Sequence, residues 1–281
     1  MKWLVALIGL FFTACAKKPL ELHVMTFNIR YINSGDQGAK AWDNRRGAVA
    51  SLMRDSGSDF IGVQEAFRSM LDDIHQRMPG YGEIGVGRED GRTKGEYAAI
   101  LYQEDRWTLL ENGTFWLSDT PDVVASSTWG NKVTRICTWG LFQHKDSSRQ
   151  IYVCNAHFDH ESQLARENSA KLVLQRIQSL VPAMPVILMG DLNAPPENPA
   201  IRHITESGPR PLRDVWALLH PLPAEQSGTF HGFDGRRNGA RIDYIFTNYR
   251  LQPLSATLHH DNNAGVYPSD HYPVSTKLRL P

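Results

Sequence analysis

The sequence is poor in cysteine and has no excess of charge of either sign. Its 281 residues include three cysteines, and 30 basic side chains balance 30 acidic ones. So few cysteines exclude a disulfide-rich scaffold, and no Cys-x-x-Cys or Cys/His spacing of a zinc site occurs. A formal charge of zero supplies no global attraction to nucleic acid or anionic lipid, which argues against a high-affinity nucleic-acid binder.

Internal repeats, low-complexity tracts and linker-like shifts of composition are also missing from the sequence. The length and a hydrophobic content of 41% suit one large α/β domain with a sizeable core. We therefore expect residues 22–281 to fold as a single domain and to act as a monomer.

The N-terminus carries an apolar run of signal-peptide length. Lys2 precedes residues 3–12, a stretch too short to span a bilayer well. Small residues then lead to Cys15 in a pattern that resembles the bacterial lipobox, in which the cysteine is diacylated and becomes the mature N-terminus. Phe12 departs from the Leu, Val or Ile that is usual at its place in that pattern.

This N-terminal pattern predicts export. We expect a signal peptide over residues 1–15, a tether over residues 16–21 and attachment to the membrane through a lipid on Cys15. Ala16, rather than Asp, after the cysteine favours a lipoprotein of the outer membrane or cell envelope. The alternative is an ordinary secretory cleavage, which would give a secreted protein.

Cys137 and Cys154 are the cysteines that remain in the mature chain. They lie on neighbouring strand-like runs, so a disulfide is conceivable in an oxidising compartment. Two buried free thiols fit the sequence equally well. The sequence leaves this choice open.

Short apolar and β-branched runs predict strands, and apolar residues three and four apart predict helices. Residues 45–54 and 161–181 fit helices, and Pro182 ends the second one. The most economical arrangement is two sheets packed face to face and covered by helices. The predicted strands are 22–27, 59–63, 97–102, 135–142, 150–155, 186–189, 242–247 and 273–280.

Residues 185–193 carry the most informative motif of the chain. The uncharged apolar run 186–189 suits a strand that is buried on both faces. Gly190 interrupts the run, and Asp191 and Asn193 follow it. The pattern therefore places a carboxylate and a carboxamide at the carboxyl end of a buried strand, where α/β folds bind ligands.

Further polar segments lie at the ends of other predicted strands. Each segment alone has a structural explanation, as a turn, a helix cap or a satisfied interior histidine. Together they bring carboxylates, amides and histidines to the edges of the same sheets. The segments are Thr26-Phe27-Asn28, Gln64-Glu65, Glu96-Tyr97, Asn155-Ala156-His157, Ile242-Asp243-Tyr244 and Ser269-Asp270-His271.

Together with Gly190-Asp191-Leu192-Asn193, these segments resemble the endonuclease/exonuclease/phosphatase superfamily of DNase I-like, metal-dependent hydrolases. They occur in the order of that family, which includes DNase I, abasic-site endonucleases, inositol polyphosphate 5-phosphatases and neutral sphingomyelinases. The resemblance implies a four-layer α/β sandwich, with two mixed β-sheets packed face to face and helices outside. Around Asn28, Glu96 and residues 113–118 the chain resembles an exported bacterial branch of the family.

Hydrolysis of a phosphate ester needs neutralised phosphoryl oxygens, an activated water and help for the leaving oxygen. Carboxylate and carboxamide oxygens suit hard ions such as Mg²⁺ or Mn²⁺, whereas zinc favours nitrogen and sulfur ligands. Glu65 is the first predicted metal ligand, with Asn28 and Asp270 beside it, as the resemblance also implies. Whether one or two ions bind stays open.

The catalytic roles follow from the same chemistry. Asp191 is predicted to orient or deprotonate the attacking water, and Asn193 to hold the phosphate or a metal-bound water. His271 is predicted to bind the phosphoryl group, while Asp243 fixes its tautomer and raises its pKa. These roles predict in-line attack by water without a covalent enzyme intermediate.

Four further residues complete the predicted site. His157 and Glu96 form a second histidine–carboxylate pair, similar to one in DNase I, and His157 either donates a proton to the leaving group or only binds phosphate. Arg135 is a candidate phosphate contact, with a surface cation as the alternative. Asp159 is a candidate contact for a second metal or a substrate hydroxyl, with a cap for the following helix as the alternative.

The predicted activity is that of a phosphodiesterase or phosphatase on a small or lipid-derived phosphate ester. The alternative enzyme is a secreted DNase or RNase, for which nucleic acid is a substrate. Zero net charge and the lack of a basic–aromatic stripe favour the first reading. The non-enzyme alternative is a lipoprotein that uses the same fold only to bind a partner.

Overall fold

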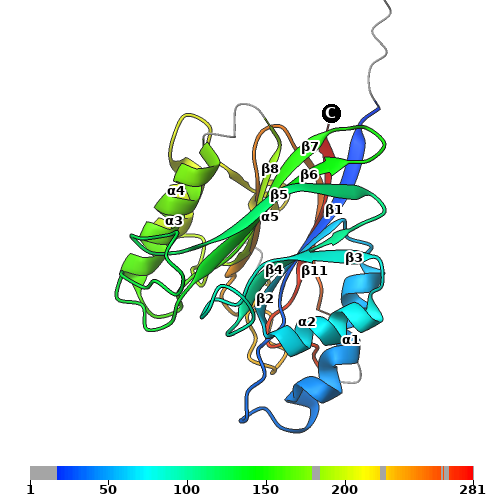
Figure 1. The fold of residues 1–281 in the computed structure, drawn as a ribbon, viewed down its shortest axis with the longest axis vertical. Helices are drawn as coiled ribbons and strands as arrows, with labels where there is room; N and C mark the ends of the chain where they lie inside the picture. The colour runs from blue at the N-terminus through cyan, green and yellow to red at the C-terminus, as the bar shows by residue number, and fades with distance from the viewer. Residues whose placement is uncertain (1–17, 179–183, 222–225, 261, 263–265, 281) are drawn as a thin grey trace, which may run out of the picture.

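Two six-stranded mixed sheets pack face to face in the computed structural model, and helices cover their outer faces (Figure 1). The structure describes residues 18–178, 184–221, 226–260, 262 and 266–280. The predicted signal peptide, Cys15 and the end of the second predicted helix lie outside these residues. The architecture is the predicted four-layer α/β sandwich.

The first sheet has the strand order β11-β12-β1-β2-β4-β3, and the second has the order β5-β6-β7-β8-β10-β9. β1 and β2 are parallel, β7 and β8 are parallel, and the other neighbours are antiparallel. The first sheet contains β1 (Leu20–Asn28), β2 (Phe60–Ala66), β3 (Tyr81–Ile84), β4 (Tyr97–Gln103), β11 (Gln252–Leu258) and β12 (Val274–Leu280). The second contains β5 (Trp107–Trp116), β6 (Ile136–His144), β7 (Gln150–His157), β8 (Val186–Asp191), β9 (Arg213–Asp214) and β10 (Asp243–Thr247).

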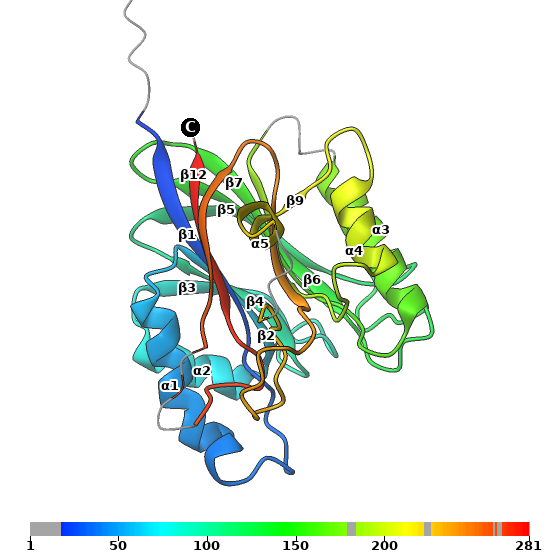
Figure 2. The same cartoon turned by 180° about the vertical axis from the view of Figure 1, so that it is seen from behind.

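The helices form the two outer layers. α1 (Trp42–Asp55) and α2 (Arg68–Arg77) pack on the first sheet, as the two opposite views in Figures 1 and 2 show. α3 (Gln163–Gln178) and α4 (Pro199–Glu206) pack on the second sheet. A short 3-10 helix, Gly38–Lys40, precedes α1, and α5 (Val215–Leu219) contacts β10 and β11.

The central strands are buried on both faces. In β1, Leu22 and Val24 pack between the sheets, whereas Met25 and Phe27 pack against α1 and α2. This period of two follows from the alternation of side chains along a strand. β8 is buried on both faces in the same way, which is why its sequence is continuously apolar. Each such side chain stabilises the fold by about 1.5–3 kcal/mol on burial.

Each of the eight predicted strands corresponds to an observed strand, within a few residues at the ends. The four strands that the sequence pattern did not reveal are β3, β5, β9 and β11, and these are the edge strands of the two sheets. Edge strands are partly exposed and carry more polar residues, so their apolar pattern is weak. The first predicted helix starts three residues late, because α1 begins at Trp42.

Three structural findings bear on the predictions for the N-terminus and the cysteines. β1 begins at Leu20, so the last two residues of the predicted tether are paired in the sheet, Leu20 opposite Leu280. Cys137 and Cys154 are buried free thiols, which decides between the two alternatives. Among the described residues, none of the helices is both long and apolar enough to cross a membrane.

Candidate active site

A cavity of about 400 Å³ opens at the end of the sandwich where β1, β2, β7 and β8 terminate. The antiparallel neighbours β4, β6, β10 and β12 begin at this same end. The topology therefore collects residues from eight strand ends around one space. The predicted site residues that line the cavity are Glu65, Glu96, Arg135, His157, Asp191, Asn193, Asp270 and His271.

Gly190 lets β7 and β8 approach closely beside the cavity. Its φ of 146° is in the region that favours glycine, and a Cβ there would lie 1.9 Å from the carbonyl oxygen of Ala156. Because the two strands are parallel and in register, His157 lies opposite Asp191. The glycine of the 185–193 motif thus serves to pair these two side chains.

Glu65 reaches the cavity from an irregular strand end. The pairing of β2 with β4 shifts between Gln64 and Ala66, and Glu65 has a φ of 63°, which is uncommon for a residue with a side chain. Such backbone strain persists where the surrounding structure enforces it, and it concentrates at functional sites.

The Asn28 side chain links two carboxylates of the site. Asn28 is fully buried behind the surface, and its Nδ2 donates to Glu65 Oε1 at 3.0 Å and to Asp191 Oδ2 at 2.9 Å. Asn28 Oδ1 accepts the backbone N–H of Arg30 at 3.0 Å. The amide therefore bridges two carboxylates through its nitrogen, and binding an ion through its oxygen would require the amide to turn over.

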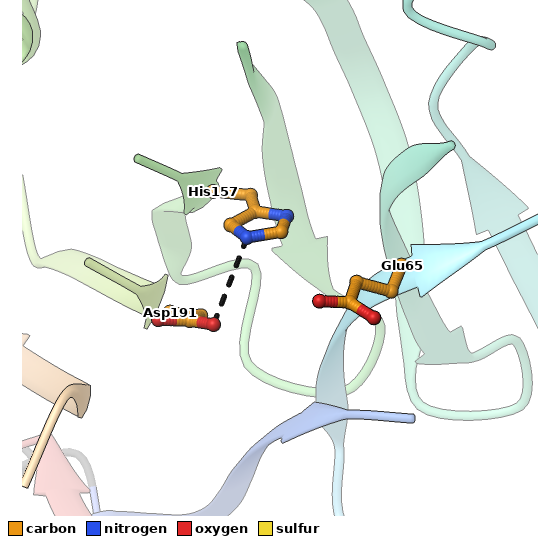
Figure 3. Close-up of side chains that lie close together, drawn as sticks. All are labelled: Glu65, His157 and Asp191. Atoms are coloured by element: carbon orange, nitrogen blue, oxygen red, sulfur yellow. Dashed lines mark ion pairs between the residues drawn. The ribbon is translucent and has the colours of Figure 1, made fainter. Parts of the chain in front are cut away.

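The grouping of potential metal ligands differs in part from the predicted set. Glu65, His157 and Asp191 come from three strands and each offer a ligand atom within 4.8 Å of the others (Figure 3). Asp270 lines the same cavity, and its Oδ2 lies 3.7 Å from Arg30 Nη1. Burial raises the pKa of Asp270, and the Glu65 carboxylate adds to this.

These residues fit a divalent cation. Buried carboxylates of like charge repel one another, and a bound cation would offset that repulsion. An oxygen-rich set with one imidazole suits Mg²⁺ or Mn²⁺. Asp191, Asp243 and His271 form a second group whose ligand atoms lie within 4.8 Å of one another, so Asp191 is common to both groups.

His271 is held by Asp243, as predicted. Nδ1 of His271 lies 2.9 Å from Asp243 Oδ2, and Nε2 lies 3.9 Å from Asp191 Oδ2. Burial disfavours the imidazolium, but the carboxylates of Asp243, Asp191 and Asp270 together outweigh burial and raise the pKa of His271 well above its ordinary value, with Asp243 contributing most. Burial and the neighbouring Asp243 raise the pKa of Asp191.

His157 has the opposite electrostatic environment. Burial, followed by the cations Arg135 and Arg88, lowers the pKa of His157 well below its ordinary value. Arg135 is buried, and its Nη1 lies 2.9 Å from His157 Nε2, so it is not the surface cation of the alternative reading. The cavity thus holds one imidazole that favours the neutral form and one that favours the cation.

Glu96 pairs with Arg88, which is not among the predicted site residues. Arg88 makes a bidentate contact with the Glu96 carboxylate at 2.7 and 2.9 Å. The expected pair between Glu96 and His157 is longer, at 4.0 Å. Arg88 lies in the glycine-rich loop that precedes Glu96, and its only sequence signal is that position before a strand-end carboxylate.

Of the two remaining predicted contacts, Asn193 lies at the cavity and Asp159 does not. Asn193 lines the cavity with a φ of 48°, and its Nδ2 donates to the carbonyl of Phe158 at 3.1 Å. Asp159 is buried and does not line the cavity. Its Oδ1 accepts the N–H groups of Glu161 and Ser162, so it caps the segment before α3, as in the alternative reading.

Gln64 and Asn155, which belong to two of the motifs, join the sheets beneath the cavity. Asn155 Oδ1 accepts from Gln64 Nε2 at 2.6 Å. Asn155 Nδ2 donates to the carbonyls of Val63 and Ala99 at 3.0 and 2.7 Å. A side chain of the second sheet thus satisfies buried polar groups of the first, which fixes the sheets relative to each other near the site.

Carboxylates that could hold a cation lie beside two histidines with opposite pKa shifts, and this combination suits the hydrolysis of phosphoric esters. The chain belongs to the Endonuclease/Exonuclease/phosphatase family, whose model matches residues 25–271.

Solved structures similar to this chain come from Bacteroides thetaiotaomicron. One is a protein of the endonuclease/exonuclease/phosphatase family, with 34% identity, a TM-score of 0.85 and coverage of 94% of this chain and 99% of that one. Another is a mannosyl-6-phosphatase, with 34% identity, a TM-score of 0.82 and coverage of 92% and 99%. An uncharacterized protein of Acanthamoeba polyphaga mimivirus is 27% identical over 161 residues, which span 54% of this chain and 59% of that relative.

Proposed function

We propose that this protein is a phosphomonoesterase that uses Mg²⁺ or Mn²⁺ to hydrolyse phosphorylated sugars. The observation that carries the proposal is the position of Asp191, whose Oδ2 lies 3.6 Å from His157 Nε2 and 3.9 Å from His271 Nε2. A buried carboxylate between two imidazoles is suited to accept a proton from a water molecule next to a bound phosphate.

The mechanism that fits the site is in-line attack by water. Asp191 orients the water and takes its proton, and no covalent intermediate forms. His271, kept cationic by Asp243, binds a phosphoryl oxygen and stabilises the charge that develops there. Because Asp191 serves the water and His157 the phosphate, a cation would be held by Glu65, the remaining member of their ligand group, with Asp270, and by Asn28 once its amide has turned over. It would neutralise the phosphoryl oxygens and assist the leaving oxygen.

The remaining polar groups of the cavity bind phosphate. Arg135 is buried beside His157, so its charge faces the cavity instead of solvent. His157 favours the neutral form, which supports a role in binding over proton donation to the leaving group. Asn193 lines the same wall and supplies an amide for the phosphate.

Three observations support a sugar phosphate as the substrate. A relative with 34% identity over nearly its whole length is described as a mannosyl-6-phosphatase. A cavity of about 400 Å³ is near the small end of the range for small-molecule sites, roughly 300–1,000 Å³. Zero net charge offers no long-range attraction to a polyanion, which disfavours the alternative of a nuclease.

We also propose that the protein is exported and anchored through a lipid on Cys15, as a lipoprotein of the outer membrane or cell envelope. Few residues separate Cys15 from β1, which begins at Leu20. The nine residues of β1 span about 30 Å, and the cavity lies at the far end of that strand. An anchored domain would therefore present its cavity away from its own membrane, which favours water-soluble substrates over lipid headgroups.

The test is a substrate panel with the purified protein in Mg²⁺ or Mn²⁺. The panel contains mannose 6-phosphate, glycerol 3-phosphate, an inositol phosphate, sphingomyelin, plasmid DNA and RNA. We expect phosphate release from the sugar phosphate that EDTA abolishes. Cleavage of DNA or RNA without phosphate release from sugar phosphates would favour the nuclease. If no ester of the panel is hydrolysed, the non-enzyme alternative, a lipoprotein that only binds a partner, would be favoured.

A further inference from the structure

Phe230 is an exposed aromatic side chain at the wall of the candidate active site. It is 42% exposed, it lines the cavity, and its ring centroid lies 5.1 Å from that of His271. A single exposed apolar residue is common on protein surfaces and carries no argument by itself. The way the backbone holds this residue is what sets it apart.

Three successive residues tie this loop to the strand ends of the site. Thr229 Oγ1 accepts the N–H groups of Ile242 and Asp243 at 2.9 and 3.1 Å. Phe230 forms an isolated β-bridge with His271. The N–H of His231 donates to the carbonyl of Asp270 at 2.9 Å.

The loop is also closed tightly at its base. A Cβ at Gly239 would lie 2.2 Å from the carbonyl oxygen of Phe230, so the two chain segments can approach only with glycine there. The buried His231 ring stacks on Tyr272 with centroids 4.0 Å apart. Phe230 is therefore an exposed side chain on a fixed backbone. Because the loop is already ordered, little conformational entropy is lost when a ligand packs on the ring.

We infer that Phe230 is the platform on which the sugar ring of the substrate packs. The inference rests on the proposed function. A phosphoryl group bound at His271 leaves the rest of the molecule within reach of the neighbouring Phe230 ring. The C–H face of a pyranose is apolar and suits an aromatic ring, while its hydroxyls face polar groups of the same cavity, among them Arg30 and His160. Phe230 thus selects ring-bearing phosphate esters.

The test compares kcat/KM for mannose 6-phosphate with kcat/KM for glycerol 3-phosphate, which has no ring. We expect Phe230→Ala to lower the ratio of the two values about tenfold, mainly through KM for the sugar phosphate. Phe230→Trp should restore most of the ratio. The matched control is Tyr249→Ala, which removes an aromatic ring of similar exposure, 49%, that does not line the cavity, and it should leave the ratio unchanged.

Three results would overturn the inference. One is an unchanged ratio in Phe230→Ala, and another is an equal loss on both substrates, which would make Phe230 only a support for His271. A third is a selective loss on adenosine 5′-monophosphate, which would assign the ring to a nucleobase. Hydrolysis of neither phosphomonoester by the wild-type protein would instead overturn the proposed function, so the two failures are distinguishable.

Discussion

Asp243 and His271 form a buried pair in which Oδ2 lies 2.9 Å from Nδ1. Asp243 opens β10, whereas His271 precedes β12 of the other sheet, so the pair joins the two sheets at the cavity. The contact engages Nδ1 and leaves Nε2 toward Asp191. Of the three carboxylates that raise the pKa of His271, Asp243 contributes most, so activity measurements can detect its loss.

We expect Asp243→Asn to shift the alkaline limb of the pH profile of kcat/KM to lower pH. The Asp243 carboxylate raises the pKa of His271, so the imidazolium persists above the ordinary titration range of histidine. Without that carboxylate the pKa falls, and the cation is lost at lower pH. A pH profile of phosphate release measures the shift, with the exposed Asp122→Asn as control. An alkaline limb that stays in place would refute this role of the pair.

Arg88 and Glu96 should behave as a coupled pair in stability measurements. Their side chains are largely buried, and removing one partner leaves the other charge uncompensated. We expect Arg88→Met and Glu96→Gln each to lower the free energy of unfolding by about 3 kcal/mol, and the double variant to lose less than the sum. Urea denaturation measures all three.

The control for this cycle is the exposed pair of Arg279 and Glu21, for which we expect a coupling below about 1 kcal/mol. Strict additivity of the Arg88 and Glu96 substitutions would show that the bidentate contact is not a stabilising unit.

Asn155→Ala should destabilise the fold. The substitution leaves Gln64 and the carbonyls of Val63 and Ala99 buried without the hydrogen bonds that Asn155 makes with them. We expect a loss of about 3 kcal/mol and a fall in Tm of roughly 6–12 °C. Calorimetry measures the change, with Asn112→Ala on the exposed face of β5 as control. A Tm equal to that of the control would mean that this network does not join the sheets.

Much of this site could be predicted from the chain because its residues lie at the ends of apolar strands. Asp191 follows the clearest buried run, and an apolar run that ends in Gly190 is readable without a structure. Parallel pairing then brings His157 opposite Asp191, which the order of strands in the sequence permits but does not specify.

The residues that were missed have side chains whose meaning depends on contacts distant in sequence. In the sequence Arg88 is one of several charged residues in a polar loop. Its importance becomes visible only from its contact with Glu96 and from its lowering of the pKa of His157. Phe230 sits in a glycine-rich stretch whose anchors, Ile242 and Asp270, follow it by 12 or more residues. Neither residue belongs to a local pattern of period or spacing, so no sequence rule singles it out.

In the proposed reaction Asp191 activates water for the hydrolysis of a phosphate ester. The most direct test is phosphate release from mannose 6-phosphate in Mg²⁺, measured for the wild-type protein and for Asp191→Asn. We predict release by the wild type, none upon addition of EDTA, and a loss of at least about 10³-fold in kcat for a variant that keeps the wild-type Tm within a few degrees. Wild-type turnover by Asp191→Asn would contradict the account.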